Sequence, residues 1–145
     1  MNISQILLCI FLPMLSFIQN VRAQEREYDK LLLGTHLFSL QWISLEHFGK
    51  VEIKRKGNVY AIKGKQISKE KTEYIEIDGT LKPLSPSHLE FNGIITTQVN
   101  FFGSNPCIRK GIFNFKRTGT RKYWRLQEMD SPCNFGTDYI DIYPK

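Results

Sequence analysis

Three acidic residues near the end of the chain are the first candidates for chemistry. Glu128, Asp138 and Asp141 are carboxylates, and two carboxylates held close together can act as general acid and general base. Each also has basic residues near it on an apparent strand, and exposed charges of this kind form surface ion pairs that add little stability. We therefore expect surface ion pairs here and predict no catalytic residue.

Other patterns of enzyme sites do not occur in the sequence. It contains no glycine-rich phosphate loop, nucleophile elbow, helical histidine pair or calcium loop. No spacing supports a Ser-His-Asp arrangement, which is a spatial constellation. The histidines His36, His47 and His88 are too scattered for a zinc site. The sequence therefore predicts no metal and no cofactor.

Two cysteines each follow a proline. Cys107 and Cys133 lie 26 residues apart, and in an exported domain such a pair predicts one disulfide. Closing a loop of that length restrains the unfolded chain by about 3.5 kcal/mol in the chain-entropy account.

Aromatic and charged residues near the C-terminus form the candidate binding surface. By alternation, Tyr123 and Arg125 share one side of an expected strand, while Tyr139, Asp141 and Tyr143 share one side of the last strand. If these two strands are neighbours, the five side chains form one patch, and tyrosine and arginine are favoured at recognition surfaces. The alternative is that cross-strand Arg-Asp and Tyr-Tyr pairs only stabilise the sheet.

A sheet is needed to position these residues, and strand-like alternation recurs along the chain. No helix-like segment of useful length follows the N-terminal apolar run, and turn signals are regularly spaced. These patterns predict an all-β domain of about eight antiparallel strands that form a small curled barrel, with a β-sandwich as the alternative. The expected strands begin near Leu37, Val51, Val59, Tyr74, Leu89, Ile112, Lys122 and Thr137.

Several details of that barrel can be predicted. Residues 36–43 are expected to form a strand with Phe38, Leu40 and Trp42 on the same side. Residues 82–87 are expected to form a proline-rich turn, and residues 100–109 a long connection. Residues 121–128 are expected to form a central strand that places Trp124 in the core. The sequence leaves open whether the interior of the barrel is filled by side chains or holds a small ligand.

Three glycines follow similar strand segments. Gly64, Gly79 and Gly93 each stand on the same side of the strand as the two apolar residues before them. Glycines at such inward positions mark sharp bends of a strongly curled sheet. The alternative is that they only end their strands at turns.

Residues 1–23 have the pattern of a secretory signal peptide. An apolar run from Ile6 to Ile18 is followed by the small residue Ala23, after which cleavage is expected. The run is too short for a transmembrane helix, which needs about 20 apolar residues. We expect residues 24–145 to form a single exported β domain, periplasmic or extracellular, in which 24–33 are a loosely ordered lead-in, without a transmembrane segment.

The charge of the chain restricts its partners. The formal net charge is +6 at pH 7, and one positive charge leaves with the signal peptide. Outside the cytoplasm, a basic protein meets anionic lipid, lipopolysaccharide or acidic polysaccharide more often than nucleic acid, which we do not expect as a partner. A positive charge of this size is also ordinary for solubility.

The C-terminal segments resemble those of a group of small exported bacterial proteins that carry no assigned activity. The segments are residues 122–129 (KYWRLQEM), the Pro132-Cys133 pair, residues 138–143 (DYIDIY) and, near the start, residues 38–43 (FSLQWI). This resemblance covers nearly all of the expected mature chain. It implies export and two cysteines but transfers no catalytic or binding residue.

In architecture the chain is also similar to lipocalin-like barrels and periplasmic lysozyme inhibitors, which are small disulfide-braced β-proteins, by fold analogy alone. It lacks the lipocalin Gly-x-Trp pattern near the first strand, and its positive charge is a poor match for basic lysozyme.

Two classes of function remain. The first is a non-catalytic binding module for a small amphipathic ligand or an anionic envelope component. The second is a secreted hydrolase whose acid and base groups come together only in the folded protein. Because no catalytic spacing is recognisable, the sequence favours the binding module.

Overall fold

The computed structural model describes residues 3–145, with side chains from residue 14 onward. Met1, Asn2 and the side chain of Cys9 lie outside the described part, as do the side chains of much of the apolar run that predicts a signal peptide. The chain divides into two compact units, Met1–Lys30 and Leu31–Lys145.

Helix α1 (Ile3–Leu32) makes up the first unit and extends two residues into the second. The expected loosely ordered lead-in at 24–33 is therefore wrong, because the helix continues through it. Residues 24–32 (QEREYDKLL) are rich in strong helix formers and contain no glycine or proline. The helix ends just before Gly34, whose φ of +108° favours glycine. Among described helices, none has both the length and the hydropathy to cross a membrane.

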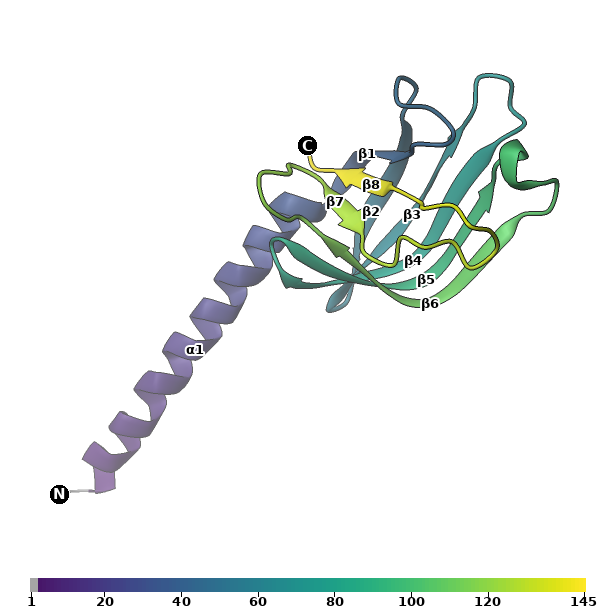
Figure 1. The fold of residues 1–145 in the computed structure, drawn as a ribbon. Coiled ribbons are helices and arrows are strands. Elements are labelled where there is room, and N and C mark those ends of the chain that lie inside the picture. Colours follow the sequence, from purple (N-terminus) through teal and green to yellow (C-terminus); the bar gives the residue numbers. More distant parts are fainter. Residues whose placement is uncertain (1–2) are drawn as a thin grey trace. The chain divides into compact units, whose positions relative to one another are not determined.

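The second unit is a closed antiparallel barrel in which every strand pairs with its neighbours in the sequence (Figure 1). The predicted all-β barrel is thus confirmed, in preference to a β-sandwich. Its strands are β1 (Gly34–Leu40), β2 (Gly49–Lys56), β3 (Val59–Ile67), β4 (Tyr74–Ser85), β5 (His88–Gln98), β6 (Cys107–Lys116), β7 (Trp124–Leu126) and β8 (Ile140–Tyr143).

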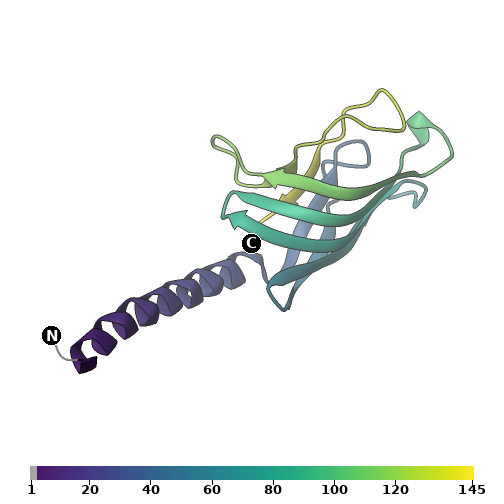
Figure 2. The same ribbon diagram turned by 90° about the horizontal axis from the view of Figure 1, so that it is seen from below.

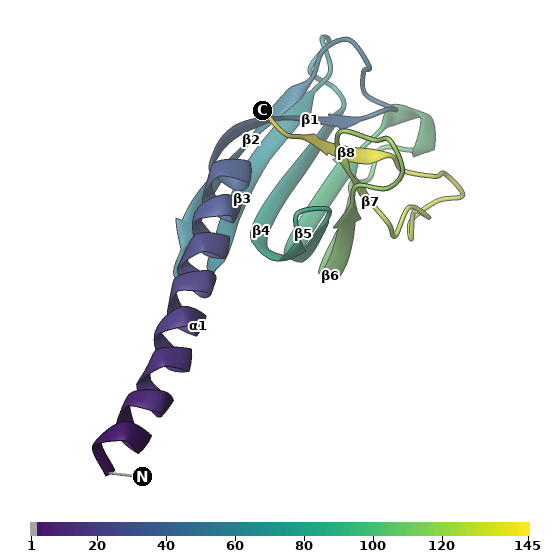
Figure 3. The same ribbon diagram turned by 90° about the vertical axis from the view of Figure 1, so that its left-hand side faces the viewer.

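Pairing between the first and last strands closes the barrel. Strand β1 pairs with β8 from Leu37 opposite Tyr143 to Leu40 opposite Ile140. Figure 3 shows β8 lying beside β1 with β7 next to it. All connections are hairpin-like, as expected when the strand order follows the sequence.

Large apolar side chains from all eight strands form the core. Strand alternation directs one set of residues inward, and Trp124 is fully buried, as predicted. Other side chains with 2% exposure or less include Phe38, Leu40, Tyr60, Ile62, Ile77, Phe91, Phe115, Leu126 and Ile142. These aromatic and aliphatic groups pack the inside of the barrel.

Glycines in neighbouring strands allow the sheet to curl. Gly79 of β4 lies opposite Gly93 of β5, which lies opposite Gly111 of β6. A Cβ atom at Gly79 would lie 2.3 Å from the carbonyl oxygen of Asn92 and 2.7 Å from the Cα atom of Gly93. The strands therefore approach too closely here for any other residue. This geometry supports the prediction of bends rather than simple turns, and the curvature of β4, β5 and β6 is visible in Figure 2.

The first strand is shorter than predicted. It ends at Leu40, where the N–H of Ile43 donates to the carbonyl of Leu40 at 3.0 Å and turns the chain. The side chain of Gln66 accepts the N–H of Leu40 at 2.7 Å and holds the loop that follows. The prediction that Trp42 belongs to this strand, beside Phe38 and Leu40, is therefore wrong; Trp42 lies in a turn and is 39% exposed.

Other boundaries also differ from the prediction. Strand β4 continues to Ser85 through the expected turn at 82–87, because a register shift between Pro83 and Ser85 accommodates the proline. The expected connection 100–109 includes a short 3-10 helix, η1 (Asn100–Phe102), and the start of β6. Strands β7 and β8 are shorter than expected, because the chain between them forms a long loop with one bridge, Asp130 to Thr137.

Alternating strand directions place loops 41–48, 68–73, 99–106 and 127–139 at the same end of the barrel. Figure 2 shows them gathered there. We call this end the loop end. Loops commonly carry binding residues on a rigid scaffold, so the loop end is the place to look for a site.

Candidate binding site

The five residues predicted to form a patch lie together on the outer side of β7 and β8. The two strands are neighbours, and Arg125 lies directly opposite Asp141 in the ladder. The rings of Tyr123 and Tyr143 are 5.0 Å apart between centroids. The guanidinium of Arg125 lies 4.2 Å from the ring centroid of Tyr139. We call these five residues the tyrosine–arginine cluster.

Arg125 is the centre of this cluster. Its Nε and one terminal nitrogen each donate a 2.7 Å hydrogen bond to the carboxylate of Asp141. A bidentate pair of this kind is among the strongest side-chain interactions. The side chains of Arg125 and Asp141 are only 13% and 5% exposed. The guanidinium also lies 5.3 Å from the ring centroid of Tyr123, so it is surrounded by its own protein.

The protonation of the cluster follows from these contacts. Hydrogen bonding to Asp141 raises the pKa of Arg125, and burial raises the pKa of the Tyr143 phenol. Arg125 is therefore a permanent cation and Tyr143 remains neutral at physiological pH. Because the charge of Arg125 is already matched by Asp141, the cluster positions the ring of Tyr139 rather than offering a free cation.

Tyr139 also lines an apolar groove of about 370 Å³ at the loop end. We call this the aromatic groove. Its other walls come from the loops after β1, β5 and β7, which are far apart in the sequence. The lining residues are Gln41, Trp42, Phe101, Phe102, Phe135, Gly136, Thr137 and Tyr139.

Aromatic rings in the groove contact one another in favourable geometries. Trp42 meets Phe102 edge-to-face at 5.2 Å and Phe101 in a stacked arrangement at 6.5 Å. Phe102 meets Phe135 edge-to-face at 6.0 Å. Such pairs contribute about 0.5–1.5 kcal/mol each beyond their buried area. The rings therefore hold one another in place without a ligand.

Hydrogen bonds to the backbone fix the groove walls. The side-chain amide of Gln41 donates to the carbonyl of Thr137 at 2.6 Å, and its oxygen accepts the N–H of Tyr139 at 2.7 Å. The indole N–H of Trp42 also donates to the carbonyl of Thr137, at 3.2 Å. These bonds join the loop after β1 to the loop before β8. The groove is thus largely preformed, as is usual for ligand sites.

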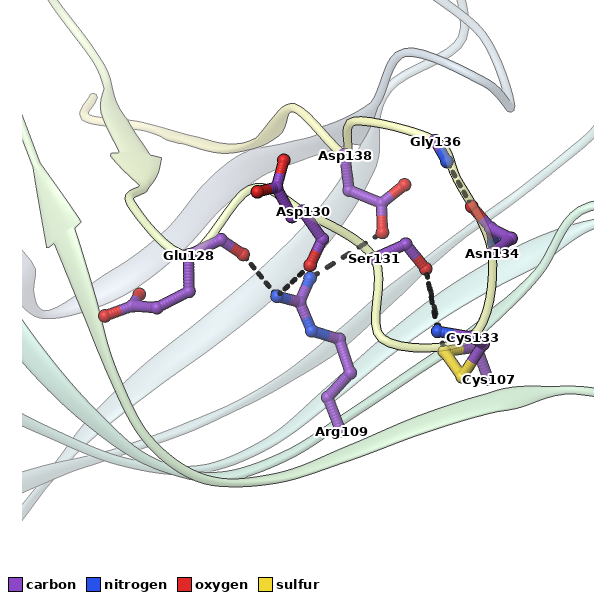
Figure 4. Close-up of a disulfide and its surroundings, with 9 residues drawn as sticks. All are labelled: Cys107, Arg109, Glu128, Asp130, Ser131, Cys133, Asn134, Gly136 and Asp138. Atoms are coloured by element: carbon purple, nitrogen blue, oxygen red, sulfur yellow. Dashed lines mark hydrogen bonds and ion pairs between the residues drawn. A yellow bond between two sulfur atoms is a disulfide. The ribbon is translucent and has the colours of Figure 1, made fainter.

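A disulfide supports the loop that carries half of the groove. Cys107 and Cys133 are joined, with a Cα–Cα distance of 5.8 Å, as predicted. Figure 4 shows the bond between β6 and the 127–139 loop. A second, more polar pocket of about 250 Å³ lies beside it, and its walls include Thr97, Asn105 and Asp138. The disulfide ties the middle of this loop to the start of β6.

A buried ion pair lies near the disulfide. Arg109 points from β6 toward the loop and lies 3.6 Å from the carboxylate of Asp138, with both side chains at most 5% exposed (Figure 4). It also donates to the carbonyl oxygens of Glu128 and Asp130. Burial lowers the pKa of Arg109 and raises the pKa of Asp138. The pair joins β6 to the loop from within.

The three carboxylates considered for acid–base chemistry have structural partners instead. Asp141 binds Arg125, and Asp138 pairs with Arg109. Glu128 accepts hydrogen bonds from the backbone N–H and side-chain amide of Asn114 at 2.9 and 2.8 Å. The prediction of surface ion pairs is wrong for Asp138 and Asp141, because both pairs are buried. Within the described residues, no group of acidic, histidine or cysteine side chains is arranged to hold a metal ion.

Sequence reasoning missed most of the aromatic groove. It placed Trp42 on the same side of a strand as Phe38 and Leu40, because strand alternation was extended past Leu40. Phe101 and Phe102 were recognised only as part of a connection, and Phe135 was not singled out. The available signal was that Phe101, Phe102 and Phe135 occur outside the alternating segments, in connections where polar residues are more usual.

Comparison with known proteins assigns no activity to this site. The model of the PM1083 family matches residues 19–144. Uncharacterized protein PM1083 of Pasteurella multocida (strain Pm70) is 40% identical over 121 residues, which cover 83% of this chain and 78% of the relative. No solved structure gives a significant match. These findings agree with the expected likeness to proteins without an assigned activity.

Proposed function

We propose that this chain, which belongs to the PM1083 family, is an exported, non-catalytic binding module that holds a small amphipathic ligand in the aromatic groove. One observation carries the proposal. Two phenylalanines on separate loops of the groove are exposed to solvent, Phe101 by 77% and Phe135 by 92%.

Exposed phenylalanine rings forgo the stabilisation that burial would give, which suggests that their exposure serves a function. Burying a phenylalanine side chain stabilises it by about 1.5–3 kcal/mol relative to leaving it in water. Contiguous apolar surface of this kind marks binding sites in folded proteins. Phe101 and Phe135 each contact Phe102, whose ring also meets Trp42. The exposed rings are therefore parts of one continuous surface.

The chemistry of the groove favours an amphipathic ligand. Its rings offer apolar contact area, while the polar groups of Gln41, Thr137 and the Trp42 indole are already bonded to one another. A ligand thus gains binding free energy by placing an apolar part among the rings. The groove is partly open to solvent, so a polar part of the ligand can remain hydrated, which avoids the cost of burying it.

The interior of the barrel is a weaker candidate for the ligand site. Trp124, Phe38 and Phe91 are fully buried there with their aliphatic neighbours. An eight-stranded barrel is just wide enough for side chains to fill it. We therefore place the ligand at the loop end.

The tyrosine–arginine cluster supports the groove in this proposal. Tyr139 contacts the ligand directly, because its ring lines the groove. Tyr123, Arg125, Asp141 and Tyr143 act as positioning residues, since they pack around Arg125 and Arg125 packs against Tyr139. The hydrolase alternative has less support, because Glu128, Asp138 and Asp141 are engaged with structural partners.

Export is part of the proposal. Residues 1–23 have the pattern of a signal peptide, and we propose cleavage after Ala23. The disulfide between Cys107 and Cys133 supports an oxidising compartment, periplasmic or extracellular.

Tryptophan fluorescence tests the groove directly, because Trp42 lies in it and Trp124 is fully buried. We expect dodecyl maltoside, titrated below its micelle concentration, to change the emission in a saturable way, whereas maltose alone has no effect. The neutral head group excludes attraction to the positive protein. The Trp42→Phe variant, which keeps Trp124, should show no change.

Substitution of the exposed rings provides a second test of the proposal. We expect the Phe101→Ser/Phe135→Ser variant to bind dodecyl maltoside about tenfold more weakly or worse, since two ring contacts are lost. Its melting temperature should fall only modestly, because both rings are largely exposed although their contacts with Trp42 and Phe102 are lost. The control is Leu84→Ser on β4, an apolar residue that is 47% exposed and lies away from the groove. Equal loss in the control, or unchanged affinity in the double variant, would contradict the proposal.

A further inference from the structure

Strand β6 has a full partner on one side and a short one on the other. Strand β5 pairs with it along its whole length, from His88 opposite Lys116 to Thr97 opposite Cys107. Strand β7 pairs only with Phe115 and Lys116. The first two thirds of β6 therefore have no strand on the β7 side in the part of the chain that the structure describes.

Backbone contacts show which groups face that side. The carbonyl of Asn114 accepts the N–H of Gln127 at 2.8 Å, and the N–H of Asn114 donates to the side chain of Glu128 at 2.9 Å. In an extended strand the N–H and C=O groups of alternate residues face the same neighbour. The backbone groups of Ile112, Lys110 and Ile108 thus also face the β7 side. We call these three residues the free edge of β6.

Side-chain contacts join this edge to the loop across from it. Arg109 extends from β6 to the carbonyls of Glu128 and Asp130, so a long side chain separates the two segments (Figure 4). The disulfide between Cys107 and Cys133 makes a second side-chain link beyond it. Among the described residues, no backbone hydrogen bond joins the free edge to the loop.

Outward side chains give the free edge a specific character. Ile108 and Ile112 are 64% and 61% exposed, and Lys110 between them is also exposed. Lys110 lies opposite Ile94 of β5, which is 39% exposed. Natural proteins usually blunt an exposed strand edge, and apolar residues on such an edge favour pairing with another chain. The edge therefore presents a cation between two apolar side chains.

We propose that the free edge of β6 binds an extended peptide segment of another protein, which adds a strand to the barrel. Main-chain hydrogen bonds to Ile108, Lys110 and Ile112 provide the affinity, as in other strand-addition complexes. An acidic residue opposite Lys110, with apolar residues opposite the two isoleucines, provides the selectivity. A second copy of this chain paired about Lys110 would place two lysines opposite each other, which is unfavourable.

Hydrogen exchange measured by NMR tests both the edge and its occupant. In the free protein, the amides of Ile108, Lys110 and Ile112 should exchange about tenfold or more faster than those of Arg109 and Phe113, which face β5. A capped peptide with the core Val-Thr-Asp-Thr-Val is the probe. At saturation, it should slow exchange at the three edge amides and shift their resonances.

Charge reversal tests the selectivity. Lys110→Glu should weaken binding of the aspartate peptide about tenfold and improve binding of the same peptide with lysine in place of aspartate. Lys82→Glu, on the outer side of β4, is the matched control and should change neither affinity. The aromatic-groove variant Phe101→Ser/Phe135→Ser should bind the peptide normally, which separates this inference from the proposed function.

Several outcomes would overturn the inference. The free edge is disproved if its three amides are already protected in the free monomer. Peptide binding at other residues, or no response of the edge amides to either peptide, would refute strand addition at this site. Protection that appears with protein concentration and without peptide would show that the occupant is a second copy.

Discussion

At the residue scale, Arg125 shows how a predicted binding residue can serve a different role. Its guanidinium is bonded twice to Asp141 and lies against the rings of Tyr123 and Tyr139. A cation with these partners is not free to bind an anion. In our proposal, it instead holds Tyr139 at the wall of the aromatic groove.

Removing Arg125 should therefore affect stability first. We expect Arg125→Ala to lower the free energy of unfolding by about 3–5 kcal/mol, because Asp141 is left buried without its partner. The Arg125→Ala/Asp141→Ala variant should lose less than the sum of the two single variants. Urea unfolding of the four proteins measures this coupling. Additive losses would show that the two side chains do not act as a pair.

Asp138 gives a second prediction, which concerns pH. Burial raises the pKa of its carboxyl in the folded state, so over part of the acidic range the folded protein binds more protons than the unfolded chain. The resulting stabilisation is fully present below about pH 4, the usual pKa of an aspartate, and is lost as the pH rises through the folded pKa. We expect wild type to gain stability relative to Asp138→Asn between pH 7 and pH 4.

Urea unfolding of both proteins at the two pH values measures this difference. The difference in free energy of unfolding between wild type and Asp138→Asn should be larger at pH 4 than at pH 7. If it is the same at both pH values, or smaller at pH 4, attraction to Arg109 outweighs the cost of burying the carboxylate.

At the element scale, the 127–139 loop depends on its disulfide. Replacing Cys107 and Cys133 with serine should lower the free energy of unfolding by about 3.5 kcal/mol, the restraint expected for this loop length. Because Phe135 and Tyr139 lie on the loop, the same variant should bind dodecyl maltoside more weakly even where it remains folded. Chemical unfolding and the fluorescence titration measure the two effects separately. Unchanged affinity in the folded variant would show that the groove does not need the bond.

The curled strands give another prediction at this scale. Gly79→Ala should destabilise the barrel by about 1–3 kcal/mol, as overpacking does, because its Cβ would collide with the backbone of β5. Thr80→Ala, the next residue on β4, is the control and should have a smaller effect. Thermal unfolding measures both. Equal melting temperatures would mean that the strands can separate at this position without cost.

At the scale of the whole molecule, alternation was sufficient to predict the barrel. Period-two patterns identified all eight strands, and turn signals such as 56–58 predicted the short hairpins. The disulfide was predicted from the two cysteines of the expected mature chain. The tyrosine–arginine cluster was predicted because alternation gave the correct side for each residue and the two strands are indeed neighbours. These features depend on local sequence, which is why they could be predicted.

Features set by tertiary contacts could not be predicted in this way. The end of β1 depends on Gln66, a residue more than twenty positions away that binds the backbone of Leu40. The burial of Asp138, a loop residue, depends on Arg109 in β6. The aromatic groove combines rings from three loops, and no sequence period relates Trp42 to Phe101 and Phe135.

Native mass spectrometry of the protein purified from its natural source tests the central claim most directly. We predict that wild type carries one small amphipathic molecule per chain, and that Phe101→Ser/Phe135→Ser, purified identically, has lost it. The control Leu84→Ser should retain the molecule. An empty wild-type protein that also fails to bind dodecyl maltoside, or a molecule retained equally by the groove variant, would contradict a ligand in the aromatic groove.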